Sequence, residues 1–253
     1  QCYNIADTLI VGQCIGANAL AAVGSAYTLM VFLISILLGL SMGSGTVFSL
    51  QYGAGDLSAL RRSIYVSLLL IGTVTILLNV AVFLWLDPIL RWLQVPYDIY
   101  PLMRNYLWII FWGIVFTFLY NFYAALLRAV GDSVTPLWFL AVSVVLNIGL
   151  DLFLILVLDQ GIEGAAVATV IAQGTAASGI LLYTYKIRPE LRLHREDMRF
   201  DRSSLREITS FSTLTCVQQS VMNFGILMVQ GLVNSFGTVV MAAFAAAVKI
   251  DSF

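Results

Sequence analysis

The stretch from Leu137 to Leu158 (LWFLAVSVVLNIGLDLFLILVL) is apolar along almost its whole length. As a helix it is long enough to cross the roughly 30 Å of hydrocarbon in a bilayer. It nevertheless carries a carboxylate, Asp151, about 6 Å from its middle at 1.5 Å per residue. Asn147 lies four residues earlier and therefore on the same helical face. An acidic group at this depth is costly, so Asp151 predicts a functional site.

The composition predicts that the whole chain is a membrane protein. Of its 253 residues 60% are apolar and 11% are charged, whereas about a quarter of the residues in a soluble domain are charged. The three cysteines (Cys2, Cys14 and Cys216) form no close-spaced pair, so we expect neither a disulfide framework nor a zinc site. The sequence contains no nucleophile motif and no phosphate loop. We therefore expect an all-α, multi-span membrane protein that is not an enzyme and has no cofactor beyond a coupling ion.

Breaks in the apolar pattern divide the chain into successive helices. The expected helices are a partial first helix ending near Gly12, then 26–51, 63–86, 105–127, 137–158 and 165–185, a seventh after Glu207 that ends at Asn234–Gly237, and the start of an eighth. The first and the eighth look incomplete, so we interpret the chain as a piece of a larger protein. Residues 1–185 are then a first transmembrane lobe, residues 186–207 a charged linker, and residues 208–253 the start of a second lobe.

The positions of the basic residues predict the orientation of these helices. One side collects Arg61, Arg62, Arg128, Lys186, Arg188, Arg192, Arg195, Arg199, Arg202 and Arg206, whereas Arg91 and Arg104 fall on the other. By the positive-inside rule the first side, with the linker 186–207, is cytoplasmic, in a multi-pass protein of the cell membrane. The acids of the linker nearly balance its bases. We therefore interpret it as a solvated connection rather than a surface for nucleic acid or anionic lipid.

A short internal similarity suggests that a second lobe repeats the first. Aligning the chain with itself pairs Gly16 with Gly237 and Phe32 with Phe253, just after the charged linker. Six crossings separate the two segments, so the second copy enters the membrane in the same direction, which predicts a parallel repeat. Three glycines of the second helix (Gly39, Gly43 and Gly45, in GLSMGSG) are most simply a close-packing face.

Four polar residues in the apolar segments form a candidate cation site. Asp7, Asn147, Asp151 and Thr169 supply carboxylate, amide and hydroxyl oxygens, which suit a hard monovalent cation such as sodium and equally suit protons. The residues alone do not choose between the two ions. The structural alternatives are a helix cap for Asp7, a buried pair for Asp151, and interhelical hydrogen bonding for Asn147 and Thr169.

Five segments, in order, resemble the multidrug and toxic compound extrusion (MATE) transporters. They are ADTLIVGQCIGANALAAVG (6–24), SLQYGAGDLSALRR (49–62), LLRAVGDSVTP (126–136), LNIGLDLFLI (146–155) and GIEGAAVATVIAQ (161–173). The resemblance implies two six-helix lobes, of which this chain contains the first and the opening of the second. It also implies export of amphipathic or cationic small molecules by antiport against sodium or protons. The implied cation site is Asp7, Asn147, Asp151, Thr169 and the carbonyl of Ala165.

We therefore expect the first lobe of a cation-coupled exporter, embedded in lipid and completed by the rest of a second lobe. The alternatives are a flippase for a lipid-linked precursor, against which the scarcity of Lys and Arg in the spans argues, and an uncoupled channel or structural membrane protein. Five aromatic residues of the fourth helix (Trp108, Phe111, Trp112, Phe116 and Phe118) fit packing, lipid contact or a binding wall equally well.

Overall fold

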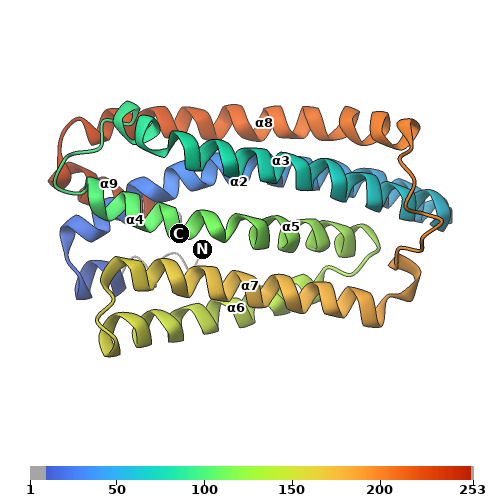
Figure 1. The fold of residues 1–253 in the computed structure, drawn as a ribbon, viewed down its shortest axis with the longest axis horizontal. Helices are drawn as coiled ribbons and strands as arrows, with labels where there is room; N and C mark the ends of the chain where they lie inside the picture. The colour runs from blue at the N-terminus through green and yellow to red at the C-terminus, as the bar shows by residue number, and fades with distance from the viewer. Residues whose placement is uncertain (1–9, 252–253) are drawn as a thin grey trace.

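The protein is a bundle of long α-helices (Figure 1). The structure, a computed structural model, describes residues 10–251. In chain order the elements are α2 (Ala17–Gly53), α3 (Leu57–Trp92), α4 (Tyr100–Trp112), α5 (Ile114–Ala129), α6 (Val134–Leu152), η1 (Phe153–Val157), α7 (Gly161–Ile187), η2 (Pro189–Leu191), α8 (Arg202–Asn234) and α9 (Thr238–Asp251). No β-strand occurs within residues 10–251, which confirms the predicted all-α class.

Most of these helices are long enough to span a bilayer. Within the described residues α2, α3, α6 with η1, α7 and α8 meet the length and hydropathy expected of a span, and α4 with α5 makes a further one if the bent pair is counted together. α2 and α8 contain 37 and 33 residues, or about 50–55 Å at 1.5 Å per residue, and α3 contains 36 residues with a kink at Trp85. Each exceeds the roughly 30 Å of hydrocarbon, so the helix ends lie in the headgroup layers or in water.

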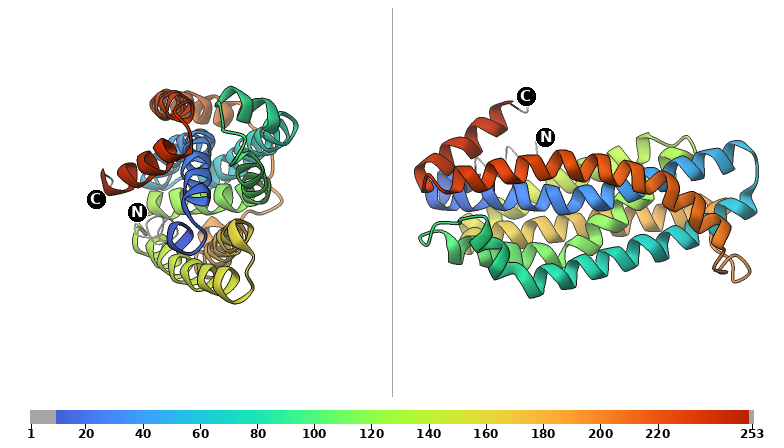
Figure 2. Two further views of the ribbon diagram at one scale, coloured as in Figure 1. Left: turned by 90° about the vertical axis from the view of Figure 1, so that its left-hand side faces the viewer. Right: turned by 90° about the horizontal axis from the view of Figure 1, so that it is seen from above.

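α2 is the central helix and packs against α3, α4, α5, α8 and α9. The end-on view in Figure 2 shows it in the middle of the bundle. Gly39 and Gly43 face α8, where an added methyl group would overlap the backbone at Cys216 and Ser212. Small residues let two helices approach closely in lipid, where the hydrophobic effect does not hold helices together. The predicted close-packing face is therefore confirmed for these two glycines.

The expected fourth helix, residues 105–127, is broken, so its prediction as one continuous helix is wrong. α4 and α5 meet at Gly113 with a bend of 47°. α7 comes so close there that a Cβ on Gly113 would lie 3.0 Å from Val170. The amide of Asn79 in α3 donates to the carbonyl of Phe111 at 2.7 Å. A neighbouring side chain thus satisfies a carbonyl at the break, as hydrocarbon requires.

A buried polar network joins the end of α8 to α2 and to Leu93, just beyond the end of α3. The Nδ2 of Asn234, the last residue of α8, donates to the carbonyl of Leu93 at 2.8 Å and to the hydroxyl of Ser25 at 3.1 Å. Its Oδ1 accepts from Gln230 at 2.8 Å. α9 starts just after Gly237, which has φ 91°, as α2 starts just after Gly16, with φ 117°. The two glycines paired by the internal similarity therefore occupy equivalent positions.

The linker between α7 and α8 is folded against the bundle. α8 begins at Arg202, inside the predicted linker, because the Asp201 carboxylate caps it by accepting from the backbone N–H of Ser203 and Ser204, both at 3.1 Å. Arg61 of α3 donates from Nε to the carbonyl of Glu190 at 3.1 Å. This hydrogen bond connects the linker to the first turns of α3.

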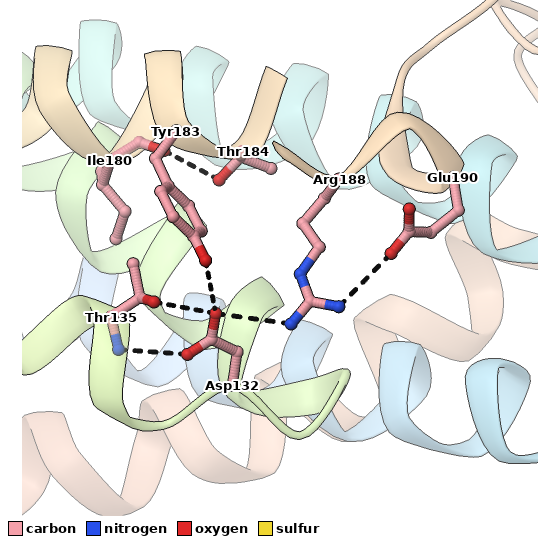
Figure 3. A network of polar contacts seen from close by, with 7 residues as sticks. All are labelled: Asp132, Thr135, Ile180, Tyr183, Thr184, Arg188 and Glu190. Carbon is pink, nitrogen blue, oxygen red and sulfur yellow. Dashed lines mark hydrogen bonds and ion pairs between the residues drawn. The ribbon is translucent and has the colours of Figure 1, made fainter. Parts of the chain in front are cut away.

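Asp132, in the turn between α5 and α6, gathers donors from two directions (Figure 3). Its carboxylate accepts from the backbone N–H and hydroxyl of Thr135, at 3.0 and 2.9 Å, and from the hydroxyl of Tyr183 at 3.3 Å. The Arg188 guanidinium lies 3.5 Å from this carboxylate and 3.5 Å from that of Glu190. Burial raises the pKa of Asp132, but these hydrogen bonds outweigh it and hold the pKa below its ordinary 3.8.

The Gly43→Ala variant should be less stable to unfolding by about 1–3 kcal/mol, because its methyl group would separate the α2 and α8 backbones. Gly53→Ala is the matched control, since open space surrounds a Cβ there. Thermal unfolding of both variants in detergent measures the difference. Equal stabilities would contradict the close approach of α2 and α8.

The Asp132→Asn variant should lose stability at neutral pH, and the loss should shrink in acid. A lowered folded pKa means that ionised Asp132 stabilises the fold above the unfolded pKa of about 4, and that this stabilisation disappears as the pH falls through the folded pKa. Thermal unfolding at a series of pH values from neutral to acid, with the exposed Asp98→Asn as control, measures this. A stability difference between Asp132→Asn and the wild type that stays constant down to the lowest pH would contradict the lowered pKa of Asp132.

Candidate functional site

Asn147 and Asp151 form a buried polar pair near the end of α6. They lie one turn apart, and both are 0% exposed. The opposite side of α6 is apolar and exposed at Val142 and Val145. The Oδ1 of Asn147 accepts no hydrogen bond from the described residues. The helix therefore turns its polar face into the bundle, with an amide oxygen there available as a ligand.

α7 supplies the other side of this pair. The Asn147 Nδ2 donates to the hydroxyl of Thr169 at 3.4 Å, and Thr169 is 2% exposed. α6 and α7 run antiparallel, so Asp151, one turn beyond Asn147, is level with Ala165, one turn before Thr169. Ala165 is fully buried. The structure thus brings these four predicted residues to one place, while Asp7 lies outside the described residues.

The helix changes its hydrogen-bond pattern directly after Asp151. α6 ends at Leu152 and continues as the π-helix η1, where the Leu158 N–H donates to the carbonyl of Phe153 at 3.2 Å, five residues earlier. The prediction of a regular α-helix through residue 158 is therefore wrong for its last turn. π-Helical turns are rare and frequently occur at functional sites. The position of this one beside the buried carboxylate supports a functional reading of Asp151.

The donor set limits which ions the site suits. Within the described residues no group of three or more His, Cys, Asp or Glu side chains is close enough to hold a metal ion. What the site offers is carboxylate, amide and hydroxyl oxygen from Asp151, Asn147 and Thr169. Such oxygens fit a hard monovalent cation, and the carboxylate alone fits a proton.

A cavity of about 400 Å³ adjoins the site. It lies between α2, α5, α6 and α7, and Thr169 is part of its wall. The lining residues are Ile34, Leu38, Thr117, Tyr120, Asn121, Leu140, Ser143, Val144, Thr169, Ala172, Gln173 and Ala176. None of these side chains is charged. The wall is therefore apolar with a few neutral hydrogen-bonding groups, as small-molecule sites commonly are.

A second cavity, of about 860 Å³, continues the first toward one end of the bundle. The two share Leu38, Tyr120, Asn121 and Leu140, and the second reaches Arg128 at the end of α5. This is the end at which the α5–α6 turn and the α7–α8 linker lie (Figure 1). The two cavities thus adjoin one another between Thr169 and that end of the bundle.

Several polar residues of the cavity wall were not predicted from the sequence. The Thr117 hydroxyl donates to the Oε1 of Gln173 at 2.8 Å, joining α5 to α7, and the Asn121 amide donates to the carbonyl of Thr117 at 2.8 Å. The Tyr120 hydroxyl donates to the carbonyl of Pro136 at 2.9 Å. The signal that was available is their polarity within apolar runs, the same signal that identified Asn147.

The aromatic residues of the fourth span do not line either cavity. Trp108 and Trp112 are 43% and 63% exposed and pack against Phe83 of α3. Phe111 and Phe118 are buried in the core. Packing and an outward-facing surface, rather than a binding wall, account for these residues.

Comparison with known proteins identifies the family. A family model described as MatE matches residues 1–153. The chain belongs to the MatE family. The probable multidrug resistance protein YpnP of Bacillus subtilis is 34% identical to this MatE chain over 250 residues, which cover 99% of the chain and 56% of the relative. The probable multidrug resistance protein YoeA of the same organism is 29% identical over 252 residues, covering 97% of the chain and 54% of the relative.

Solved MATE structures share the fold of this chain. The inward-facing structure of a multidrug resistance MATE family transporter matches with a TM-score of 0.89 at 23% identity, covering 98% of this chain and 57% of the other. The MatE chain therefore spans about half the length of the relatives it matches. The predicted family is confirmed, and so are the multi-pass membrane architecture and the prediction that the chain is not an enzyme.

The Thr169→Val variant should lower the stability of the MatE chain by about 1–3 kcal/mol, because the buried amide of Asn147 loses its acceptor. Thr175→Val is the matched control on the same helix, since Thr175 is exposed and donates only to the carbonyl of Ile171. Thermal unfolding in detergent distinguishes the two. A control variant as unstable as Thr169→Val would show that the loss reflects α7 in general.

Proposed function

We propose that the protein is part of a secondary transporter that exports amphipathic or cationic small molecules in exchange for sodium ions or protons. The observation that carries the proposal is that Thr169 belongs both to the polar site and to the wall of the cavity. Its hydroxyl accepts from Asn147 beside the buried carboxylate, and its side chain lines the neighbouring cavity. The binding of an ion or proton at the Asp151 carboxylate can therefore act on the cavity through a single side chain, that of Thr169.

The substrate class is supported by the cavity wall and by the relatives. Amides, hydroxyls and apolar carbon surround the space without a charged side chain, so size and apolar area select the ligand more than a fixed charge does. Relatives that cover nearly the whole chain are named probable multidrug resistance proteins. Broad recognition of amphipathic compounds agrees with both.

The ion would act by neutralising buried charge. Asp151 supplies the carboxylate, and the Oδ1 of Asn147 is oriented into the protein as a further oxygen ligand. We infer that Asp7 and the carbonyl of Ala165 complete the set, as the family resemblance implies. Either a sodium ion or a proton neutralises a buried carboxylate, so the ligand types suit both coupling ions.

Coupling requires that ion and substrate favour different states of the lobe. An ion bound to the hydroxyl oxygen of Thr169 competes with the hydrogen bond that this oxygen accepts from the Asn147 amide, and so changes the wall of the cavity. If the substrate binds best when the ion is absent, ion entry lowers its affinity and promotes its release. Inward ion flow then drives outward substrate movement.

We also propose that the linker end of the bundle faces the cytoplasm. Contacts at that end join the α2–α3 hairpin, the α5–α6 turn and the linker through Arg61 and Arg188. Most basic residues of the chain belong to these segments, whereas Arg91 and Arg104 lie near the junction of α3 and α4 at the opposite end. This distribution is that of the positive-inside rule. The larger cavity, which reaches Arg128, would then lie on the cytoplasmic side.

The Asp151→Asn variant of the complete transporter should insert normally and lose ion-driven efflux. A neutral amide has no negative charge that a sodium ion or a proton could neutralise. Efflux of a fluorescent amphipathic cation from vesicles, with sodium and proton gradients imposed separately, gives the rate and names the ion. Asp159→Asn, an exposed carboxylate in the α6–α7 turn, is the control and should transport normally. Undiminished efflux by Asp151→Asn under both gradients would refute the proposal.

A further inference from the structure

The structure separates the charges of the linker into an inner and an outer set. Asp197 is 8% exposed and lies 3.7 Å from Arg61. Glu190 pairs with Arg188, and Asp201 accepts the N-terminal amides of α8. Three of the acids that balance the linker in sequence are therefore engaged by the protein itself.

Five bases of the same segment lie on its exposed surface. Lys186, Arg195, Arg199, Arg202 and Arg206 are exposed, and no ion pair joins them to a carboxylate among the described residues. We refer to these five residues as the basic face. Glu196 is exposed among them, so the face keeps a clear excess of positive charge. Counting the charges of the linker in the sequence does not distinguish these exposed bases from the acids that the fold engages.

Exposed apolar side chains lie among the basic residues. Phe200 is 62% exposed, Met198 is 46% exposed and Ile187 is 58% exposed. Phe200 directly follows Arg199 and stands two residues before Arg202. Basic groups interspersed with exposed aromatic and aliphatic side chains are typical of segments that lie in the interface of a membrane.

The linker also lies at the right depth for lipid headgroups. Arg61, which holds the carbonyl of Glu190, stands two residues before the uncharged run that begins at Ser63. On the other side, α7 remains apolar up to Tyr185 and only then reaches Lys186. Both attachments therefore place the linker where the hydrocarbon ends, so the basic face is within reach of lipid phosphates.

We propose that the basic face binds anionic phospholipid headgroups of the cytoplasmic leaflet. Guanidinium groups pair with phosphate oxygens through two parallel hydrogen bonds, and Phe200 and Met198 enter the headgroup boundary beside them. The proposal rests on the proposed orientation of the bundle, but it requires neither ion coupling nor drug export. Lipid binding fixes the α7–α8 connection, and with it the junction of the two lobes, to the membrane surface.

The test measures lipid retention and leaves transport aside. The complete protein is equilibrated in mixed phosphatidylcholine and phosphatidylglycerol, and native mass spectrometry counts each lipid that stays bound. The triple variant R195Q/R199Q/R202Q should reduce the preference for phosphatidylglycerol, by about fivefold for each base removed. The triple lysine variant should retain most of the preference, because it keeps the charge. High salt should weaken the wild-type preference.

Two matched controls make the outcome specific. Arg91→Gln removes an exposed base from the opposite end of the bundle and should leave the preference unchanged. Glu196→Gln removes the exposed acid beside the basic face and should increase it. A triple glutamine variant with the wild-type preference would overturn the proposal. Displacement of the lipid by equimolar glycerol phosphate would overturn it too, because it would show a site for soluble anions.

Discussion

The fold depends on the absence of water in the hydrocarbon layer, where each backbone amide and carbonyl needs a partner within the protein. Long helices meet this condition by themselves. Where a helix breaks or ends, a side chain from another helix supplies the partner. Asn79 serves the carbonyl of Phe111 at the bend between α4 and α5, and Asn234 serves the carbonyl of Leu93 just beyond α3. These two side-chain amides therefore complete the hydrogen bonding of the backbone as well as packing between the helices.

The same condition explains how much of the fold the sequence could predict. Hydrocarbon selects long uncharged runs, so the spans, their order and their all-α character follow from the pattern of apolar runs along the sequence. The bend at Gly113 could not be predicted in this way, because a glycine at a bend and a glycine in a close-packing face look the same in an apolar sequence. Its cause is the approach of α7 and the amide of Asn79, two features distant in sequence. The π-helical turn after Asp151 likewise left no recognisable sequence signal.

The candidate site was predictable in part for a similar reason. Polar groups in an apolar run are conspicuous, and Asn147, Asp151 and Thr169 do come together between α6 and α7. Thr117 and Gln173 are equally polar, but their role depends on where α5 and α6 separate to leave a cavity. The linker is a second example, since a count of its charges does not say which of them form ion pairs or hydrogen bonds in the fold. The roles of the cavity residues and of the linker charges both depend on which residues lie close together in space.

α2 gives the bundle a mechanical property. It runs unbroken for 37 residues, about 55 Å, and contains no proline. It packs against α3, α4, α5, α8 and α9. A rod of this length acts as a lever: a tilt of about 10° about one end moves the other end by about 10 Å. A small repacking near one membrane surface can thus become a large displacement at the opposite surface, carried by a single stiff element.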